Sequence, residues 1–227
     1  MKTVGIIGGM GPLATVDLFG KIVNLTDAKC DNDHIHILID NNTYIPDRTS
    51  YILGDGENPI DELVKSAKRL KNMGADFLIM PCNTAHYFYN DIINNVSIPF
   101  INMIEETANY INNKNIKKVG LLSTTGTINA KIYDNIFKNY NIDVIKPSDE
   151  NQNIIMDLIY GIKKGKKEFD MKKIQKVLSD LRHKDVEYVI LGCTELPIAF
   201  ELLNLSGNYI DPTEILAKAA IKKAINI

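Results

Sequence analysis

The sequence repeats one plan twice, and this internal echo limits the possible folds more than any other feature. "KTVGIIGGMGP" from residue 2 resembles "KKVGLLSTTGT" from residue 117, and "ADFLIMPCNTAH" from residue 75 resembles "VEYVILGCTELP" from residue 186. A third pair, "IPFINMIEETA" and "NYIDPTEILAKAA", begins at residues 98 and 208. The pairs keep the same order at offsets of 115, 111 and 110 residues, so we expect two halves of similar structure.

Within each half, short apolar runs alternate with amphipathic helical patterns. We expect strands at residues 4–7, 36–40, 77–80, 100–103, 118–122, 143–145, 188–191 and 209–210. We expect helices at residues 13–25, 61–73, 133–140, 171–181 and 212–224, and a long irregular connection over residues 41–59. Such alternation predicts mostly parallel sheets flanked by helices, that is, an α/β fold with two pseudo-symmetric domains.

Charge and hydropathy exclude several classes of partner. The 227 residues carry a net charge of −2, with 45% hydrophobic and 24% charged residues. This balance is not that of a nucleic-acid groove or a polybasic membrane surface. No apolar run approaches the roughly 18 residues of a membrane span, and "VGIIGG" is too short for a signal peptide. We therefore expect a cytoplasmic protein that binds neither nucleic acid nor membrane.

The glycine-rich stretch "VGIIGGMGPLAT" fits the dinucleotide fingerprint through Gly9, Gly11 and Ala14. Two details oppose that reading. Pro12 removes a backbone donor where a pyrophosphate needs one. Asp40, the candidate ribose-binding acid, follows Gly11 by 29 residues, whereas the usual spacing is about 20. The loop is better explained as closing over a small amino acid.

Two of the three cysteines occupy equivalent places in the two halves. Cys82 and Cys193 each follow an apolar run, so both stand where a parallel strand ends and the ligand crevice of such a sheet lies. Cys30 lacks this context, and we interpret it as structural. Two thiols on opposite walls of a crevice suit a two-base inversion of a stereocentre, in which one thiolate removes a proton and the other thiol supplies one.

"GGMGP", "IPDRT", "PCNTAH", "STTGT", "IKKG" and "GCTEL" together resemble the cofactor-independent aspartate/glutamate racemases, most closely the aspartate racemase branch. The resemblance runs from residue 8 to residue 212. It implies an isomerase that needs neither pyridoxal phosphate nor a metal, and that acts on a small acidic amino acid. It also implies a homodimer whose subunits have two domains, residues 1–98 plus 209–227 and residues 99–208, with the active site in the cleft between them.

The same resemblance assigns roles within the site. It makes Cys82 and Cys193 the catalytic acid/base pair. Arg48 would bind the side-chain carboxylate of the substrate, helped by Lys163 or the adjacent Lys164. Four residues would hold the α-carboxylate and amino group: Asn83, Thr84, Thr125 and Thr194.

Four further residues have roles that the sequence leaves partly open. By resemblance, Met10 lines the pocket. Asp47 is placed to orient the guanidinium of the arginine beside it. His86 either supports its helix or acts electrostatically on the nearby thiol, and Glu195 either orients a neighbouring group or satisfies a helix N-terminus. His34 and His36 alternate on one side of a strand, which favours a strand-edge pair over a metal site.

The sequence therefore predicts a racemase that interconverts L- and D-aspartate. Three alternatives remain: a racemase of glutamate or of a broader set of amino acids, a non-catalytic amino-acid-binding protein, and a nucleotide-dependent oxidoreductase.

Overall fold

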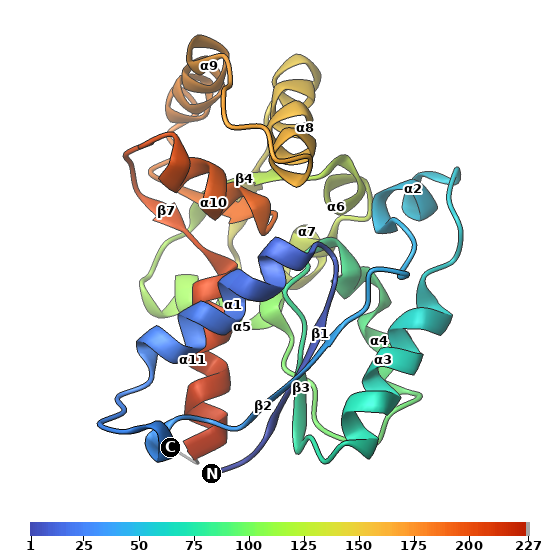
Figure 1. The fold of residues 1–227 in the computed structure, drawn as a ribbon. Coiled ribbons are helices and arrows are strands. Elements are labelled where there is room, and N and C mark those ends of the chain that lie inside the picture. The colour runs from blue at the N-terminus through green and yellow to red at the C-terminus, as the bar shows by residue number, and fades with distance from the viewer. Residues whose placement is uncertain (226–227) are drawn as a thin grey trace.

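Two parallel β-sheets form the centre of the computed structural model, which describes residues 1–225 (Figure 1). The first sheet has the order β2-β1-β3, with strands Ile37–Asn41, Val4–Gly8 and Phe77–Ile79. The second has the order β5-β4-β6-β7, with strands Asp143–Ile145, Lys118–Ser123, Tyr188–Gly192 and Tyr209–Ile210. All neighbouring strands pair in parallel. The predicted α/β fold with two sheets is confirmed.

The predicted symmetry extends to the edge of each sheet. Leu78 of β3 forms a parallel bridge with Phe100, so residues 99–101 lie beside β3 as β7 lies beside β6. Both halves therefore have the same strand order. The central strand β1 is buried along its whole length, which explains why it is an unbroken apolar run with no polar alternation.

Helices cover both sheets. Those of the first half are α1 (Pro12–Leu25), α2 (Arg48–Leu53), α3 (Ile60–Asn72), α4 (Tyr89–Ile93) and α5 (Met103–Asn113). Those of the second half are α6 (Thr125–Asn129), α7 (Ile132–Phe137), α8 (Asp149–Lys163), α9 (Met171–Arg182), α10 (Glu195–Leu202) and α11 (Pro212–Ile225). Three short 3-10 helices complete the chain: η1 (Asp31–Asp33), η2 (Thr84–Phe88) and η3 (Lys138–Tyr140). None of the helices within residues 1–225 is long and apolar enough to cross a membrane.

The last helix of each half packs on the other half. α11 belongs to the same hydrophobic cluster as β1 and β3, to which it contributes Leu216, Ala217 and Ala220. α5 sends Ile104 and Ala108 into the cluster that contains β4 and α7. The two helices also pack against each other (Figure 1). The halves are thus joined by exchanged helices as well as by contact.

Residues 209–210, expected in the first domain, pair with the second sheet. β7 pairs with β6, in the register Val189↔Tyr209, because the chain leaves α10 beside the open edge of the second sheet. Residues 99–101, expected in the second domain, likewise lie at the edge of the first sheet, where they hydrogen-bond to Leu78. The chain therefore passes from one half to the other after residues 99–101 and again after residues 209–210, and not before them. The segment expected in the first domain ends with residues 226–227, which lie outside the part of the chain that the structure describes.

Candidate active site

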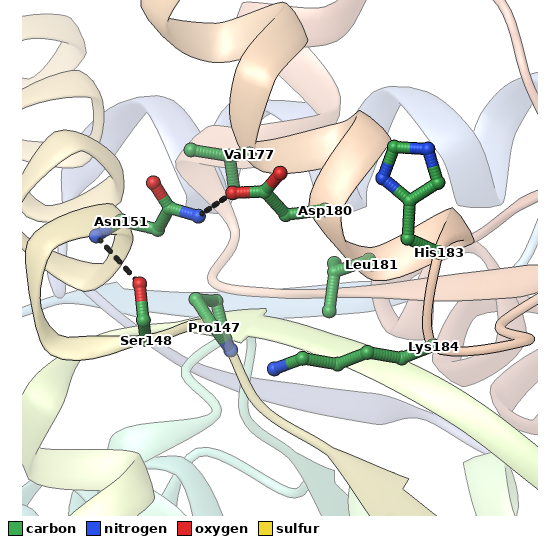
Figure 2. Close-up of a pocket in the computed structure, with 8 residues that line it drawn as sticks. All are labelled: Pro147, Ser148, Asn151, Val177, Asp180, Leu181, His183 and Lys184. Carbon is green, nitrogen blue, oxygen red and sulfur yellow. Dashed lines mark hydrogen bonds between the residues drawn. The ribbon is translucent and has the colours of Figure 1, made fainter.

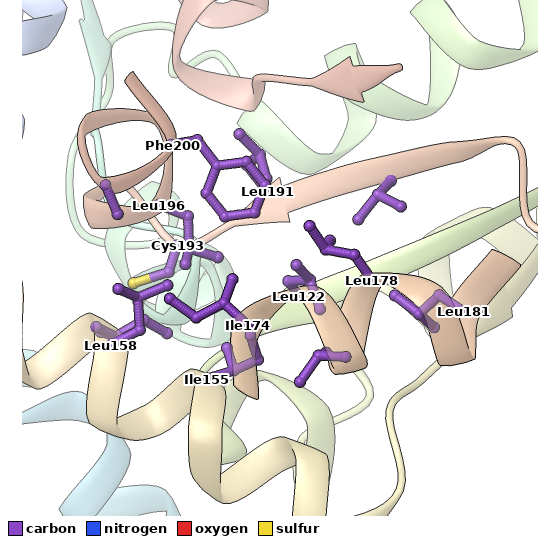
Figure 3. Close-up of a cluster of buried hydrophobic side chains, with 14 of the residues drawn as sticks. Leu122, Ile155, Leu158, Ile174, Leu178, Leu181, Leu191, Cys193, Leu196 and Phe200 are labelled. Atoms are coloured by element: carbon purple, nitrogen blue, oxygen red, sulfur yellow. The ribbon is translucent and has the colours of Figure 1, made fainter. Parts of the chain in front are cut away.

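One buried pocket between the halves contains both predicted thiols. Cys82 follows β3 by three residues and Cys193 follows β6 directly, so each stands at the carboxyl edge of its own sheet, and both line the one pocket. Each side chain is 6% exposed and also packs at the margin of its own half's core, as Figure 3 shows for Cys193. The pocket is narrow and is lined by Met10, Asp47, Arg48, Thr49, Cys82, Asn83, Thr84, Thr124, Lys163, Cys193, Thr194 and Glu195.

The glycine-rich loop brings Met10 to this pocket. Gly9 has φ +91°, and a Cβ there would lie 2.4 Å from the backbone of Asn42, so only glycine fits. The N–H of Gly9 donates to Thr15 Oγ1 at 2.9 Å, which ties the loop to α1. The loop is folded tightly against its own half and delivers an apolar side chain to the site.

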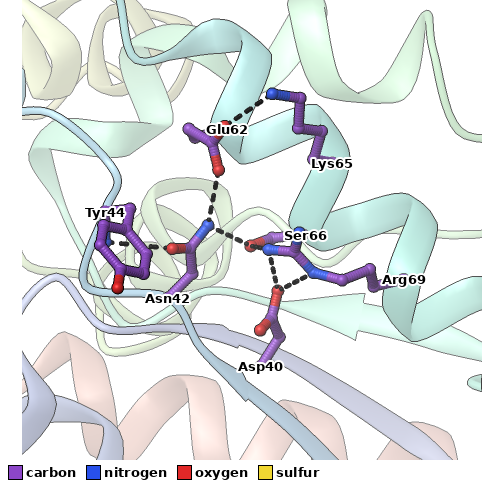
Figure 4. A network of polar contacts seen from close by, with 7 residues as sticks. All are labelled: Asp40, Asn42, Tyr44, Glu62, Lys65, Ser66 and Arg69. Carbon is purple, nitrogen blue, oxygen red and sulfur yellow. Dashed lines mark hydrogen bonds and ion pairs between the residues drawn. The ribbon is translucent and has the colours of Figure 1, made fainter.

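Asp40, the candidate ribose-binding acid, has a structural partner. Its Oδ2 lies 2.9 Å from Nε and 2.8 Å from an Nη of Arg69 on α3 (Figure 4). Asn42 extends this network by donating to Glu62 and Ser66 on the same helix. These contacts fix the end of β2 to α3 and account for Asp40 without a nucleotide.

Arg48 is a buried cation held by backbone carbonyls. Its Nη1 donates to the carbonyl oxygens of Pro46 at 2.8 Å and Ile45 at 3.2 Å, and its Nη2 to that of Met10 at 3.5 Å. None of the ion pairs found within residues 1–225 involves Arg48. Asp47, expected to orient the guanidinium, instead caps α2 by accepting from the N–H of Ser50 at 2.8 Å. Within the described residues, no side-chain carboxylate forms an ion pair with the guanidinium of Arg48.

A second cation, Lys163, completes the positive side of the pocket. Lys163 lines the pocket, whereas Lys164 is exposed outside it. Burial lowers the pKa of Lys163, but the negative charge of Glu195, and those of Cys193 and Cys82 when they are thiolates, raise it by more, so the net pKa lies above its usual value. The amine therefore remains protonated, with Nζ 5.1 Å from the centroid of the Tyr160 ring.

Cys193 has a carboxylate beside its sulfur. Its Sγ–H donates to Glu195 Oε2 at 2.9 Å, and the hydroxyl of Thr194 donates to the same oxygen at 3.3 Å. Burial and the negative charge of Glu195 raise the pKa of the Cys193 thiol well above its usual value. Cys193 is thus a thiol in this arrangement. Glu195 contacts a candidate catalytic atom and is more than a helix-terminal acid.

The loop after Cys82 is bonded to the second half. Thr84 Oγ1 lies 3.0 Å from Thr124 Oγ1 and 2.9 Å from Thr127 Oγ1. Thr124 also accepts from the N–H of Thr127 as the N-cap of α6, which turns its side chain toward Thr84. Thr125, the predicted residue, is half-buried and does not line the pocket.

His86 connects two elements through its neutral ring. Its Nε2 accepts from the N–H of Met103 at 3.1 Å, so Nδ1 carries the hydrogen and donates to the carbonyl of Cys82 at 2.9 Å. Burial lowers the pKa of His86 to about 4. The ring is therefore uncharged at neutral pH, which favours the first of the two expected roles, support of its helix, over an electrostatic effect on the thiol.

Sequence reasoning missed Thr49 and Thr124 as pocket residues. Thr49 follows Arg48 directly, and that adjacency was the available signal. For Thr124, the signal was its place before a helix start, where a threonine side chain turns back to cap the helix.

Other groups do not form a second candidate site. A hollow between α8 and α9 is lined by residues such as Asn151, Asp180 and Lys184, and contains no cysteine (Figure 2). Its buried amide already donates to Asp180 Oδ2 at 2.7 Å. His36 Nδ1 lies 3.2 Å from Thr3 Oγ1, and the described residues contain no cluster of acids, histidines and cysteines suited to a metal.

Comparison with known proteins gives consistent matches along the chain. Residues 7–220 match the family described as Asp/Glu/Hydantoin racemase. The broad specificity amino-acid racemase RacX of Bacillus subtilis is 28% identical, with 96% of each chain covered. The Picrophilus torridus aspartate racemase structure is 35% identical with a TM-score of 0.88, covering 99% of this chain and 94% of that one. Glutamate racemase from Francisella tularensis, solved with D-glutamate, is 20% identical with a TM-score of 0.72, covering 99% and 81%, which indicates a shared fold alone.

Proposed function

The chain belongs to the Asp/Glu/hydantoin racemase family, and we propose that this amino-acid racemase interconverts L- and D-aspartate, with one of Cys82 and Cys193 removing the α-proton and the other supplying a proton to the opposite face. One observation carries the proposal: both thiols line the same buried pocket as two cations, Arg48 and Lys163. A site for a dicarboxylate needs such buried positive partners, and the planar fork of arginine suits a carboxylate.

The proton balance of the proposed reaction closes without another reactant. The thiolate of one cysteine removes the α-proton, so an S–H bond forms while the C–H bond breaks and its electron pair delocalises into the α-carboxylate. The other cysteine gives its proton to the opposite face of the carbon and becomes the thiolate. Oriented donors in a pocket with little water stabilise the charge that develops.

We assign the binding roles by position in the pocket. Arg48 and Lys163 hold the side-chain carboxylate. Asn83, Thr84 and Thr194 hold the α-carboxylate and ammonium group. Thr124 takes the place expected for Thr125, because it lines the pocket and its neighbour does not. Met10 covers the bound amino acid.

Hydrogen exchange in D2O tests this proposal. Purified protein is incubated with L-aspartate, without added cofactor, and the α-hydrogen signal and optical rotation are followed. We expect deuterium at Cα together with decay of the rotation. Cys82→Ala and Cys193→Ala should each abolish racemisation, by at least about a thousandfold, while binding survives. Substantial turnover by either variant contradicts the paired-thiol mechanism, and binding without exchange favours a non-catalytic binding protein.

A racemase of glutamate or of a broader set of amino acids is the second candidate. A hollow of about 290 Å³ adjoins the pocket and shares Arg48 and Lys163 with it, while Leu13 and Ile45 add apolar surface. A side chain longer than that of aspartate has space there. Equal kcat/KM values for L-aspartate and L-glutamate, or larger ones for a neutral amino acid, would favour this candidate.

We also propose that the protein is a homodimer. The outer face of α1 leaves Leu13, Val16 and Phe19 exposed, an apolar stripe at helical spacing that a second copy of the chain would cover. Light scattering of the purified protein measures the mass, and a monomer at micromolar concentration would contradict the assignment.

The proposed chemistry also supports a cytoplasmic location. Both cysteines must stay reduced to exchange protons, and a reducing cytosol keeps thiols in that state. Fractionation of the source cells tests the location, and recovery outside the cytosolic fraction would oppose it.

A further inference from the structure

Asn83 has a fixed partner on one end of its carboxamide and none on the other. The residue follows Cys82 directly and is 2% exposed, and its Oδ1 accepts from the hydroxyl of Tyr133 at 2.6 Å. Its Nδ2 is buried and, within residues 1–225, has no hydrogen-bond partner. A buried N–H without an acceptor costs free energy, so this group is suited to a ligand that accepts hydrogen bonds.

The hydrogen-bond inventory fixes which end of the amide meets Tyr133. The phenol has one hydrogen to donate, and Asn83 Oδ1 is its only acceptor in the part of the chain that the structure describes. If the amide were turned over, the phenol hydrogen and the amide oxygen would both be left buried without partners. The observed orientation satisfies both and leaves only the NH2 group free.

Tyr133 is itself rigid and remains a donor. It lies on α7 in the second half with no exposed surface, and its ring packs edge-on against Phe137 with centroids 5.3 Å apart. Burial, together with the negative charge of Asp211, raises the pKa of Tyr133 well above its usual value, so the hydroxyl keeps its proton. A residue of one half therefore orients a pocket residue of the other.

We propose that Tyr133 is a positioning residue of the racemase, holding Asn83 so that its NH2 group, and not its oxygen, faces the amino-acid substrate and donates to the α-carboxylate. The inference rests on the proposed function for one point only, namely that the ligand is an amino acid. Tyr133 does not touch the reacting atoms, and its effect passes through Asn83.

Tyr133→Phe in the full chain tests the inference. The variant removes one oxygen and lets the amide turn over, so its carbonyl oxygen faces the substrate carboxylate in a fraction of the molecules. Because the contact is made in both ground state and transition state, we expect KM for L-aspartate to rise about tenfold with kcat within about twofold of the parent. In an Asn83→Ala background, Tyr133→Phe should change KM by less than about twofold, because residues that act as one unit are not additive.

Tyr140→Phe is the matched control. Its hydroxyl donates to Glu105 and lies 2.8 Å from Asn109 Oδ1, and Tyr140 does not line the pocket, so KM should not change. An unchanged KM in Tyr133→Phe, or the same tenfold rise in the Asn83→Ala background, overturns the inference. If the parent protein binds L-aspartate but does not exchange its α-proton, the proposed function fails, and the same variants are compared by their Kd values in calorimetry with the same expected ratios.

Discussion

At the scale of single residues, the two thiols have unlike surroundings although they occupy equivalent places. Cys193 donates to the buried carboxylate of Glu195, and its pKa is raised by burial and by that charge. Cys82 is followed by an amide and a hydroxyl, which carry no charge. The two proton transfers of the proposed reaction therefore start from different states. Cys193 begins as the proton donor, and to act as a base it must first pass its proton to Glu195.

Glu195→Gln should expose this difference. Removing the negative charge lowers the pKa of Cys193, because that charge disfavours the thiolate. Cys193 must be a thiol to donate, so activity is lost as pH rises through this pKa. Because L- and D-aspartate have equal free energies, kcat/KM is the same in both directions at every pH, and its alkaline limb should move to lower pH in both. The pH profiles of both directions measure these effects.

Glu201→Gln is the control for that variant. Glu201 lies on the same helix α10 but is exposed, so its replacement should leave both profiles unchanged. If Glu195→Gln gives the parent profile in both directions, Glu195 plays no part in the protonation of Cys193.

Local sequence context explains which site residues could be predicted. Cys82, Cys193 and Arg48 each occupy a distinct motif, and the structure brings all three to one pocket. In "STTGT" two threonines adjoin, and the pattern does not say which one caps the helix and turns its side chain toward the other half. The contact between Asn83 and Tyr133 joins residues 50 positions apart, which no local pattern reveals.

At the scale of elements, His86 joins η2 to the start of α5, and this contact predicts a pH-dependent stability. The folded-state pKa of His86 is about 4, against 6.5 for the unfolded chain. Above pH 6.5 both states are neutral there, whereas below it the unfolded chain binds a proton that the folded state excludes. Stability is therefore lost as pH falls from 6.5 toward 4, by about 2 kcal/mol between pH 7 and pH 5.

His86→Gln should remove this component. Urea unfolding at both pH values measures the loss, and the parent should lose about 2 kcal/mol more than the variant. The carboxylates that titrate over the same pH range contribute equally to both proteins. Their contribution therefore cancels when the loss of the variant is subtracted from that of the parent. Equal losses would mean that His86 is protonated in the folded protein.

All seven strands of the described residues and five of their eleven α-helices were predicted, because those runs are fully apolar or carry a clear amphipathic period, whereas the long helices α5 and α8 were not expected. α3 carries a clear stripe of Leu63, Ala67 and Leu70, and β1 is an unbroken apolar run. α2 was not predicted, because six residues are too short to show a helical period and its start depends on the cap by Asp47. The pairing of β7 with β6 was not predicted, because two residues carry no information about their pairing partner.

At the scale of the whole molecule, the exchange of α5 and α11 makes each half depend on the other. The first sheet is covered partly by α11, which follows the last strand of the second half, and the second sheet is covered partly by α5. Loss of either helix exposes a sheet face that belongs to the opposite half. The chain should therefore unfold in one cooperative transition although it contains two sheets.

Ala220→Asp tests this dependence, because Ala220 is fully buried in α11 within the cluster of the first sheet. A carboxylate buried there without a partner should lower the free energy of unfolding by about 3 kcal/mol. Hydrogen exchange measured by mass spectrometry should show the same loss of protection in β1 and in β4, although only β1 belongs to the sheet against which Ala220 packs. Lys222→Asp, exposed on the same helix, should leave both strands protected. If β1 loses protection while β4 keeps it, the halves unfold independently, and the exchanged helices do not couple them.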